Sequence, residues 1–156
     1  MSKSVRRFEE AARKTGLSFE ILRFAEGTRT AADAARAVGC DVGQIVKSLV
    51  FVADGGAFLA LTSGRNQADP DRLAVAMGVQ EVRRANADEV RAATGFAIGG
   101  TPPFGHPRLL TVLVDRDLMS YPEVWAAAGA PDAVFSLPPD DLVRASGGRV
   151  EDFAAR

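Results

Sequence analysis

Ile45-Val46-Lys47-Ser48-Leu49-Val50-Phe51-Val52 is an apolar run with one lysine near its middle. Side chains of a strand alternate between two faces, so Lys47 shares a face with Leu49 while Ser48 lies on the other. Neither face carries the polar residues of a solvated surface, and such a run predicts a strand that is covered on both sides. The sequence therefore places an ammonium group within a buried strand.

Lys47 has two interpretations from the strand alone. Lysine is seldom fully buried without a partner, because an isolated ammonium is costly to remove from water. Its side chain either enters a cavity that holds an anionic or strongly polar group, or runs along the strand edge until the amine reaches water. The strand by itself favours neither interpretation.

Bulk properties predict one domain, residues 1–156, with room for a hydrophobic core. The chain is 47% hydrophobic and 25% charged, as soluble globular proteins are. It has no apolar run of about 18 residues, so no membrane span is expected, and residues 1–10 lack the apolar segment of a secretory signal. A single cysteine, Cys40, excludes an internal disulfide and suits a cytoplasmic location.

The net charge of −1 argues against a broad nucleic-acid-binding surface. Any nucleic-acid partner is expected to be held over few phosphates, and DNA binding is not expected. Basic residues do cluster loosely, with Arg6 and Arg7 near the start and Arg83 and Arg84 later. Each cluster alone is typical of a solvated surface.

The rest of the chain alternates short helices and short strands. Helices are expected at 4–15, 31–38, 70–77, 87–94 and 139–145, and strands at 19–24, 57–62, 79–82, 109–114, 134–137 and 149–153. Gly55-Gly56 predicts a hairpin turn between two of the strands. Hairpins combined with helical crossovers indicate an α/β domain with a mixed sheet.

Several kinds of chemistry lack their motifs. Cys40 and His106, the only cysteine and histidine, do not suffice for a zinc site of the usual kind. Phosphate-binding, dinucleotide-binding and serine-hydrolase motifs are missing as well, so no metal and no cofactor are expected. A Cys40–His106 nucleophile and base pair is disfavoured, because Cys40 follows the end of a predicted helix, where a small buried thiol is the more usual role.

The loop at 99–107 is the second unusual stretch. Gly99 and Gly100 allow close approach of a ligand to their backbone N–H groups, and Pro102 and Pro103 stiffen the middle of the loop. A rigid loop with open amides is suited to binding an oxyanion or a carbonyl. The same residues are also ordinary in a plain connector between a helix and a strand.

Together the two stretches resemble the YbaK/ProX family of aminoacyl-tRNA deacylases, which are related to the editing insertion domain of bacterial prolyl-tRNA synthetase. The resemblance is carried by Gln44 to Phe51 and by Gly95 to His106, in the order and at the separation that this family shows. It extends over essentially the whole chain and implies a compact α/β fold in which short helices surround a mixed, barrel-like sheet. The implied activity is hydrolysis, in trans, of the ester of a mischarged tRNA, often a tRNA for proline.

The resemblance also implies roles for particular residues. Lys47 matches the functional lysine of the family, and Gly99 to Pro103 matches its Gly-x-x-x-Pro loop, in which Gly99 and Gly100 would hold the ester carbonyl or the ribose. The substrate-binding residues would be Ser48, Thr101, Pro102, Pro103, Phe104 and His106. Water would attack directly, oriented by a ribose hydroxyl, and Lys47 would meet either the terminal phosphate or the carbonyl side.

The expected partner is therefore the acceptor end of an aminoacyl-tRNA, and an aminoacyl-tRNA synthetase is a second partner that the resemblance allows. Two alternatives remain. One is a non-catalytic module of the same fold that binds tRNA or a synthetase. The other is an amidase or esterase that acts on small molecules.

Overall fold

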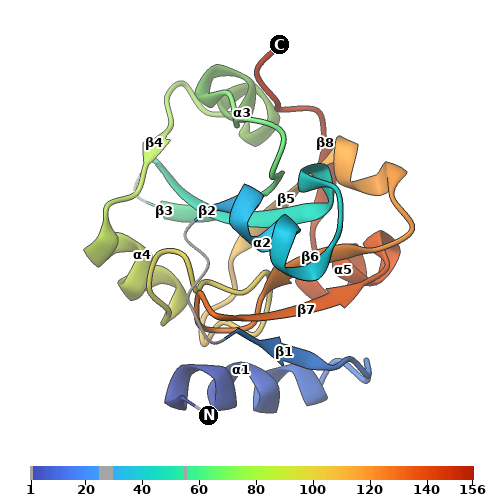
Figure 1. Cartoon of the computed structure of the whole chain (residues 1–156). Coiled ribbons are helices and arrows are strands. Elements are labelled where there is room, and N and C mark those ends of the chain that lie inside the picture. Colours follow the sequence, from blue (N-terminus) through green and yellow to red (C-terminus); the bar gives the residue numbers. More distant parts are fainter. Residues whose placement is uncertain (1, 25–29, 55) are drawn as a thin grey trace.

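Strands β2 and β3 form the centre of the sheet (Figure 1). The computed structural model describes residues 2–24, 30–54 and 56–156. The strands are β1 Ile21–Arg23, β2 Ile45–Ala53, β3 Gly56–Ser63, β4 Arg83–Arg84, β5 Thr111–Asp115, β6 Val124–Ala127, β7 Ala133–Leu137 and β8 Arg149–Glu151. The helices are α1 Lys3–Arg13, α2 Ala31–Val38, α3 Pro70–Met77, α4 Ala87–Thr94 and α5 Pro139–Ser146, with short 3-10 helices at Val42–Gln44 and Arg116–Ser120.

The sheet is mixed, in the order β1-β7-β6-β2-β3-β5-β8, and β4 adds to β2. Pairs joined by short connections, such as β2–β3 and β6–β7, are antiparallel, whereas β2–β6, β3–β5 and β5–β8 are parallel. Parallel neighbours need a longer crossover connection, which is why helices separate them along the chain. The expected single α/β domain with a mixed, barrel-like sheet is confirmed.

Helices α2, α3 and α4 begin and end where the sequence predicts. Thr30, Asp69 and Asn86 each accept a backbone N–H of the first turn through the side chain. Each of these helices then ends at a glycine with left-handed backbone. The termini of these helices are therefore set locally, by short-range hydrogen bonds.

Strand predictions were less accurate. The strand expected at 79–82 is wrong, because that segment packs Val79 and Val82 against an apolar cluster and pairing begins only at Arg83. The strand expected at 19–24 is limited to β1, and β6 was not expected. Short strands are fixed by the neighbour they pair with, which a short apolar run does not specify. Of the predicted hairpin turn, Gly55 lies outside the described residues, and Gly56 is already the first residue of β3.

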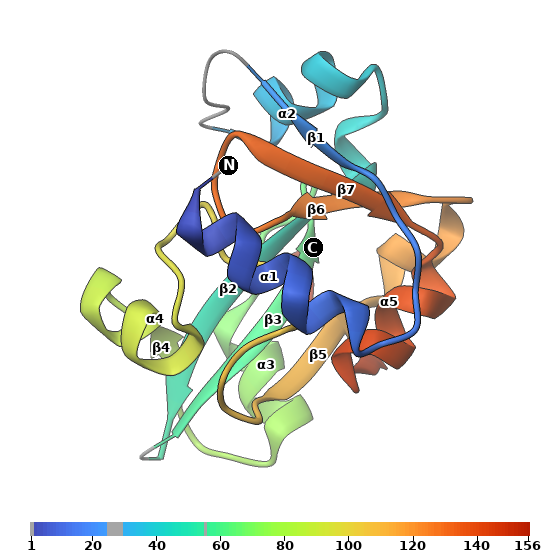
Figure 2. The same cartoon turned by 90° about the horizontal axis from the view of Figure 1, so that it is seen from below.

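An aromatic cluster ties the N-terminal helix to the loop that comes after α4. Phe8, Phe19, Phe104 and Phe135 have ring centroids 4.4 to 6.4 Å apart, within the range of favourable aromatic pairs. Figure 2 shows α1, which carries Phe8, lying across this side of the sheet. The loop at 99–107 is thus held on one side by the core of the domain.

None of the helices in the described part of the chain is long and apolar enough to cross a membrane.

Candidate active site

Strand β2 has a gap along one of its edges. On one side β3 pairs with it from Val46 to Ala53. On the other side β6 pairs at Ile45 and Val46, and β4 pairs at Phe51 and Val52. No described strand pairs with this edge between the two, from Lys47 to Leu49. Lys47 therefore lies at an interruption of the sheet.

A cavity of about 530 Å³ occupies this gap, and such a volume is typical of small-molecule sites. Its walls come from both sides of β2 and from helix α2, strands β4, β6 and β7 and the loop after α4. The lining includes Ala31, Ala34, Ile45, Val46, Lys47, Ser48, Leu49, Val50, Gly64, Arg84, Ala85, Ile98, Gly99, Thr101, Trp125, Ala126, Ala127 and Pro131. Most of these side chains are apolar, so the few polar groups determine what the cavity can bind.

The backbone of Ser48 faces the cavity. In an antiparallel pair, alternate residues direct both backbone polar groups to the partner strand. The carbonyl of Ile45 accepts from Gly64 N at 2.7 Å on the β3 side, and the carbonyl of Val50 accepts from Ala85 N at 3.0 Å on the other side. Odd-numbered residues of β2 thus bond to β3, and the N–H and C=O of Ser48 point into the gap.

The side chain of Ser48 adds an unsatisfied group. Its Oγ is buried and has no hydrogen-bond partner among the residues that the structure describes. A buried hydroxyl without a partner costs about 1–3 kcal/mol, so native structures seldom retain one without a reason. A ligand that enters the cavity can satisfy this hydroxyl.

Lys47 is half-buried, and one hydrogen bond from a described residue holds its ammonium. Its Nζ donates to the backbone carbonyl of Asn66 at 2.6 Å. An ammonium carries three N–H donors, so two remain for a ligand. Burial lowers the pKa of Lys47 below its ordinary 10.5, and nearby Arg84 lowers that pKa further, whereas Asp115 raises it. Lys47 lines the cavity, and the Asn66 carbonyl that anchors its ammonium comes from a residue outside the lining.

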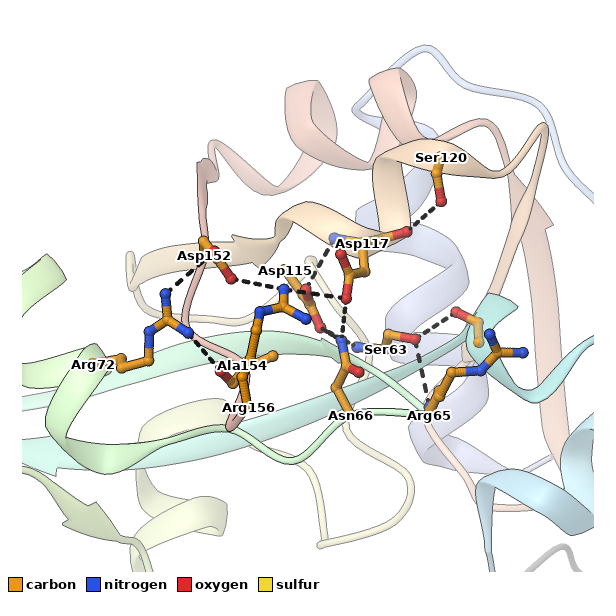
Figure 3. A network of polar contacts seen from close by, with 11 residues as sticks. Ser63, Arg65, Asn66, Arg72, Asp115, Asp117, Ser120, Asp152, Ala154 and Arg156 are labelled. Atoms are coloured by element: carbon orange, nitrogen blue, oxygen red, sulfur yellow. Dashed lines mark hydrogen bonds and ion pairs between the residues drawn. The ribbon is translucent and has the colours of Figure 1, made fainter.

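A buried carboxylate fixes the turn that holds Lys47. Asp115, fully buried, accepts from Ser63 N at 3.0 Å and from Asn66 Nδ2 at 2.9 Å (Figure 3). Asn66 Nδ2 also donates to Asp117 at 2.8 Å. These charge-assisted bonds fix the backbone of Asn66, and thereby place the carbonyl that binds the Lys47 ammonium.

Lys47 and Arg84 are the only charged residues among the described residues of the lining. That lining contains no carboxylate, histidine or cysteine. In the described part of the chain, no three His, Cys, Asp or Glu side chains are grouped as a metal ion requires. The described part of the lining therefore presents two cationic side chains and hydroxyl groups, but no carboxylate or imidazole that could act as a general base.

The loop at 99–107 contributes less to the cavity than expected. Gly99 and Thr101 line it, and the Thr101 hydroxyl donates to the Ala97 carbonyl at 2.9 Å. Gly100 is buried, its N–H donates to Ala97 O at 3.1 Å, and a Cβ on it would lie 2.9 Å from the Cα of Ala130. Gly100 thus serves close backbone packing, and its amide is already bonded.

The remaining predicted substrate-binding residues lie behind the cavity wall. Pro102, Pro103 and Phe104 are buried outside the cavity lining, and Phe104 belongs to the aromatic cluster. The Nε2 atom of His106 lies 2.8 Å from the Pro102 carbonyl, and its ring meets Phe96 edge-on. Burial lowers the pKa of His106 below 6.5, while the Pro102 hydrogen bond opposes this shift. These contacts hold the loop together.

Cys40 and His106 have separate local partners. The Cys40 thiol donates to the carbonyl of Asp41 at 3.4 Å. Burial raises the pKa of Cys40, as do the charges of Asp41 and Glu123. A raised pKa disfavours the thiolate, which is the nucleophilic form. The Cys40–His106 pair that the sequence analysis disfavoured has no geometric support.

Several lining residues were missed from the sequence. Trp125, Ala126 and Ala127 come from β6, which was not expected, and Ala31 and Ala34 come from a helix that was expected but not linked to a site. Arg84 was noted only as part of a basic pair. The small residues of α2 and the adjacent arginines were the available signals, and neither is specific without the fold.

Comparison with known proteins shows the family of this chain. Residues 25–145 match the family model described as "Aminoacyl-tRNA editing domain". The chain is 24% identical to the Enterococcus faecalis protein named "Putative Cys-tRNA(Pro)/Cys-tRNA(Cys) deacylase EbsC", over 85% of this chain and 82% of that protein. It is 28% identical to a proline–tRNA ligase of Acidithiobacillus ferrooxidans, over 85% of this chain but only 23% of the ligase.

One solved structure matches over nearly its whole length. The crystal structure of "a putative trans-editing enzyme for prolyl tRNA synthetase" shares 45% identity and superposes with a TM-score of 0.95, covering 100% of this chain and 99% of that one. The chain belongs to the aminoacyl-tRNA editing domain family. The resemblance found in the sequence is thereby confirmed.

Proposed function

We propose that this protein hydrolyses the ester bond of mischarged aminoacyl-tRNA in trans, with tRNA for proline as the expected acceptor. The observation that carries the proposal is the cavity at the gap in β2, which is lined by Lys47 and by Ser48, whose buried hydroxyl has no hydrogen-bond partner among the described residues. The names of its relatives, deacylases and trans-editing enzymes, support the same reaction.

The cavity favours direct attack by water. Since its described lining offers no carboxylate, histidine or cysteine, a covalent intermediate on the protein would lack an activated nucleophile. A water oxygen adds to the acyl carbon, oriented by the free ribose hydroxyl of the substrate. The bond from the acyl carbon to the ribose oxygen then breaks, that oxygen takes up a proton, and the amino acid leaves as its carboxylate.

Charge on the carbonyl oxygen develops where donors are placed. The N–H of Ser48 points into the gap, and Lys47 has two N–H donors that no residue of the described chain uses. Fixed donors in a site of low polarity stabilise an oxyanion strongly, because they need no rearrangement during the reaction. This arrangement supports a role for Lys47 on the carbonyl side of the ester.

Lys47→Ala tests the proposal on tRNAs that carry alanine, serine, cysteine or threonine. Loss of one charge-stabilising donor lowers kcat/KM by about 10²–10³-fold. Lys14→Ala is the matched control, because Lys14 is an exposed lysine at the end of the first helix. Equal rates for Lys47→Ala and the wild type would refute the role of Lys47, and a wild type that hydrolyses none of the four would refute the activity.

A further inference from the structure

Arg84 lies on the same face of the sheet as Lys47. It is directly opposite Phe51 in the β2–β4 register, and directly opposite residues of an antiparallel pair share a face. Lys47 and Phe51 are both odd-numbered residues of β2 and therefore lie on that face too. The guanidinium of Arg84 lies 5.7 Å from the centroid of the Phe51 ring, within cation–π range, and Arg84 is also one of the residues that line the cavity.

The two adjacent arginines differ in charge balance. Arg83 forms an ion pair with Glu89 at 2.7 Å, and this contact lowers the pKa of Glu89 to about 2. Arg84 has no carboxylate partner in the described part of the chain, although it is exposed and lines the cavity. The charge of Arg84 is thus uncompensated, whereas that of Arg83 is neutralised.

The charge of the described cavity lining favours an anionic ligand. Its described lining holds two cations, Lys47 and Arg84, and no carboxylate, and the mutual repulsion contributes to the lowered pKa of Lys47. In an aminoacyl-tRNA the aminoacyl group itself carries a cationic amine. The nearest anion to the ester is the phosphate on the 5′ side of the last nucleotide.

We propose that Arg84 binds the 5′ phosphate of the substrate's terminal nucleotide, leaving Lys47 to act on the ester. This inference rests on the proposed function. Arg84 is exposed, as a residue must be where the RNA strand leaves the cavity, while Lys47 is half-buried and tethered to the Asn66 carbonyl. A guanidinium suits phosphate because its N–H groups form paired bonds with two oxygens. Two anchor points fix the ester between them.

A binding experiment isolates the phosphate. Adenosine and adenosine 5′-monophosphate are titrated by calorimetry into the wild type, Arg84→Ala, Arg84→Lys and Arg83→Ala. The wild type binds the monophosphate about tenfold more tightly than adenosine, as one charge-assisted contact allows. Arg84→Ala loses this preference and Arg84→Lys keeps part of it, while Arg83→Ala keeps all of it, since Glu89 already neutralises Arg83.

Three results would overturn the assignment. The first is an equal preference for the monophosphate in Arg84→Ala and the wild type. The second is no preference, or no binding, in the wild type. The third is inorganic phosphate binding as tightly as the monophosphate, which would indicate a general anion site and not a nucleotide phosphate site.

Deacylation kinetics provide the second readout. With aminoacyl-tRNA, Arg84→Ala raises KM about tenfold and leaves kcat unchanged. In a plot of log(1/KM) against log salt concentration, the slope of this variant is less steep than that of the wild type by the amount expected for the loss of one phosphate contact. An unchanged KM would contradict the inference even if the wild type is active. A wild type that is inactive on every tRNA would refute the proposed function instead. The titrations with adenosine and its 5′-monophosphate would still test whether Arg84 binds the phosphate.

Discussion

The strand segment around Lys47 and the loop from Gly99 to His106 are used in different ways. At the gap in β2, an unpaired stretch of backbone and the residues Lys47 and Ser48 line a cavity. In the loop, most of the motif faces inward, where Phe104 packs in the aromatic cluster and His106 contacts the Pro102 carbonyl. The two segments differ in that residues around Lys47 line the cavity, whereas most of the loop residues pack in the core beside it.

Replacing Phe104 tests the structural half of this comparison and has the largest expected effect. Phe104→Ala removes a buried ring that contacts three other phenylalanines, so the free energy of unfolding falls by about 3–5 kcal/mol. Measured at a temperature where the variant remains folded, kcat/KM stays close to that of the wild type. A large loss of kcat/KM in the folded variant, seen by circular dichroism and deacylation together, would place Phe104 in the substrate site.

The titration of Lys47 tests the other side of the comparison, the proposed catalytic role of the strand segment around Lys47. Its pKa in the folded protein is below the 10.5 of the unfolded chain, because of burial and the charge of Arg84, with Asp115 opposing. Between the two values the unfolded chain binds the extra proton, so raising the pH through this window increases the free energy of unfolding. Enzymatic deacylation, corrected for spontaneous ester hydrolysis, decreases over the same window because the ammonium is lost.

Lys47→Met is the comparison variant for this pH dependence. Methionine has no proton to lose, so both opposing trends disappear. Denaturant unfolding measured from neutral to alkaline pH checks the predicted change in stability. Deacylation rates measured over the same range check the predicted change in activity. Parallel decreases of stability and activity in the wild type would show that Lys47 is not the titrating group.

His106 provides the smallest expected effect. Its pKa in the folded protein is below 6.5 because of burial, so the unfolded chain binds the proton first as the pH falls. The stability that the neutral imidazole contributes is present above pH 6.5 and is lost as the pH falls through the folded pKa. His106→Gln removes this acid-dependent part and leaves deacylation at neutral pH unchanged. A loss of activity at neutral pH in this variant would indicate that His106 does contribute to the substrate site.

Local signals accounted for much of the fold. The helix ends at Thr30, Asp69 and Asn86 were predictable because a capping side chain acts within three residues. The strand at 79–82 was predicted wrongly, since Val79 and Val82 pack against a core cluster without pairing with the sheet. Local pattern does not distinguish these two outcomes, because both bury the same side chains.

The candidate site was predictable only in part. Lys47, Ser48, Gly99 and Thr101 line the cavity. Lys47 and Gly99 drew attention because a charge in an apolar strand and glycines before prolines are unusual, whereas Ser48 and Thr101 were named only through the family resemblance. Arg84 and Trp125 were not assigned to it, because their place depends on which strands flank the open edge of β2.

The sequence by itself determined the class of protein, the termini of α2, α3 and α4 and the presence of a lysine in an apolar strand. Only the tertiary structure decided which motif residues line the cavity. The reason is that a cavity forms where distant segments fail to meet, here between β6 and β4 along one edge of β2. Hydrogen bonds within a helix turn are local and can be read along the chain, whereas the absence of a neighbour for Ser48 is a property of the assembled sheet.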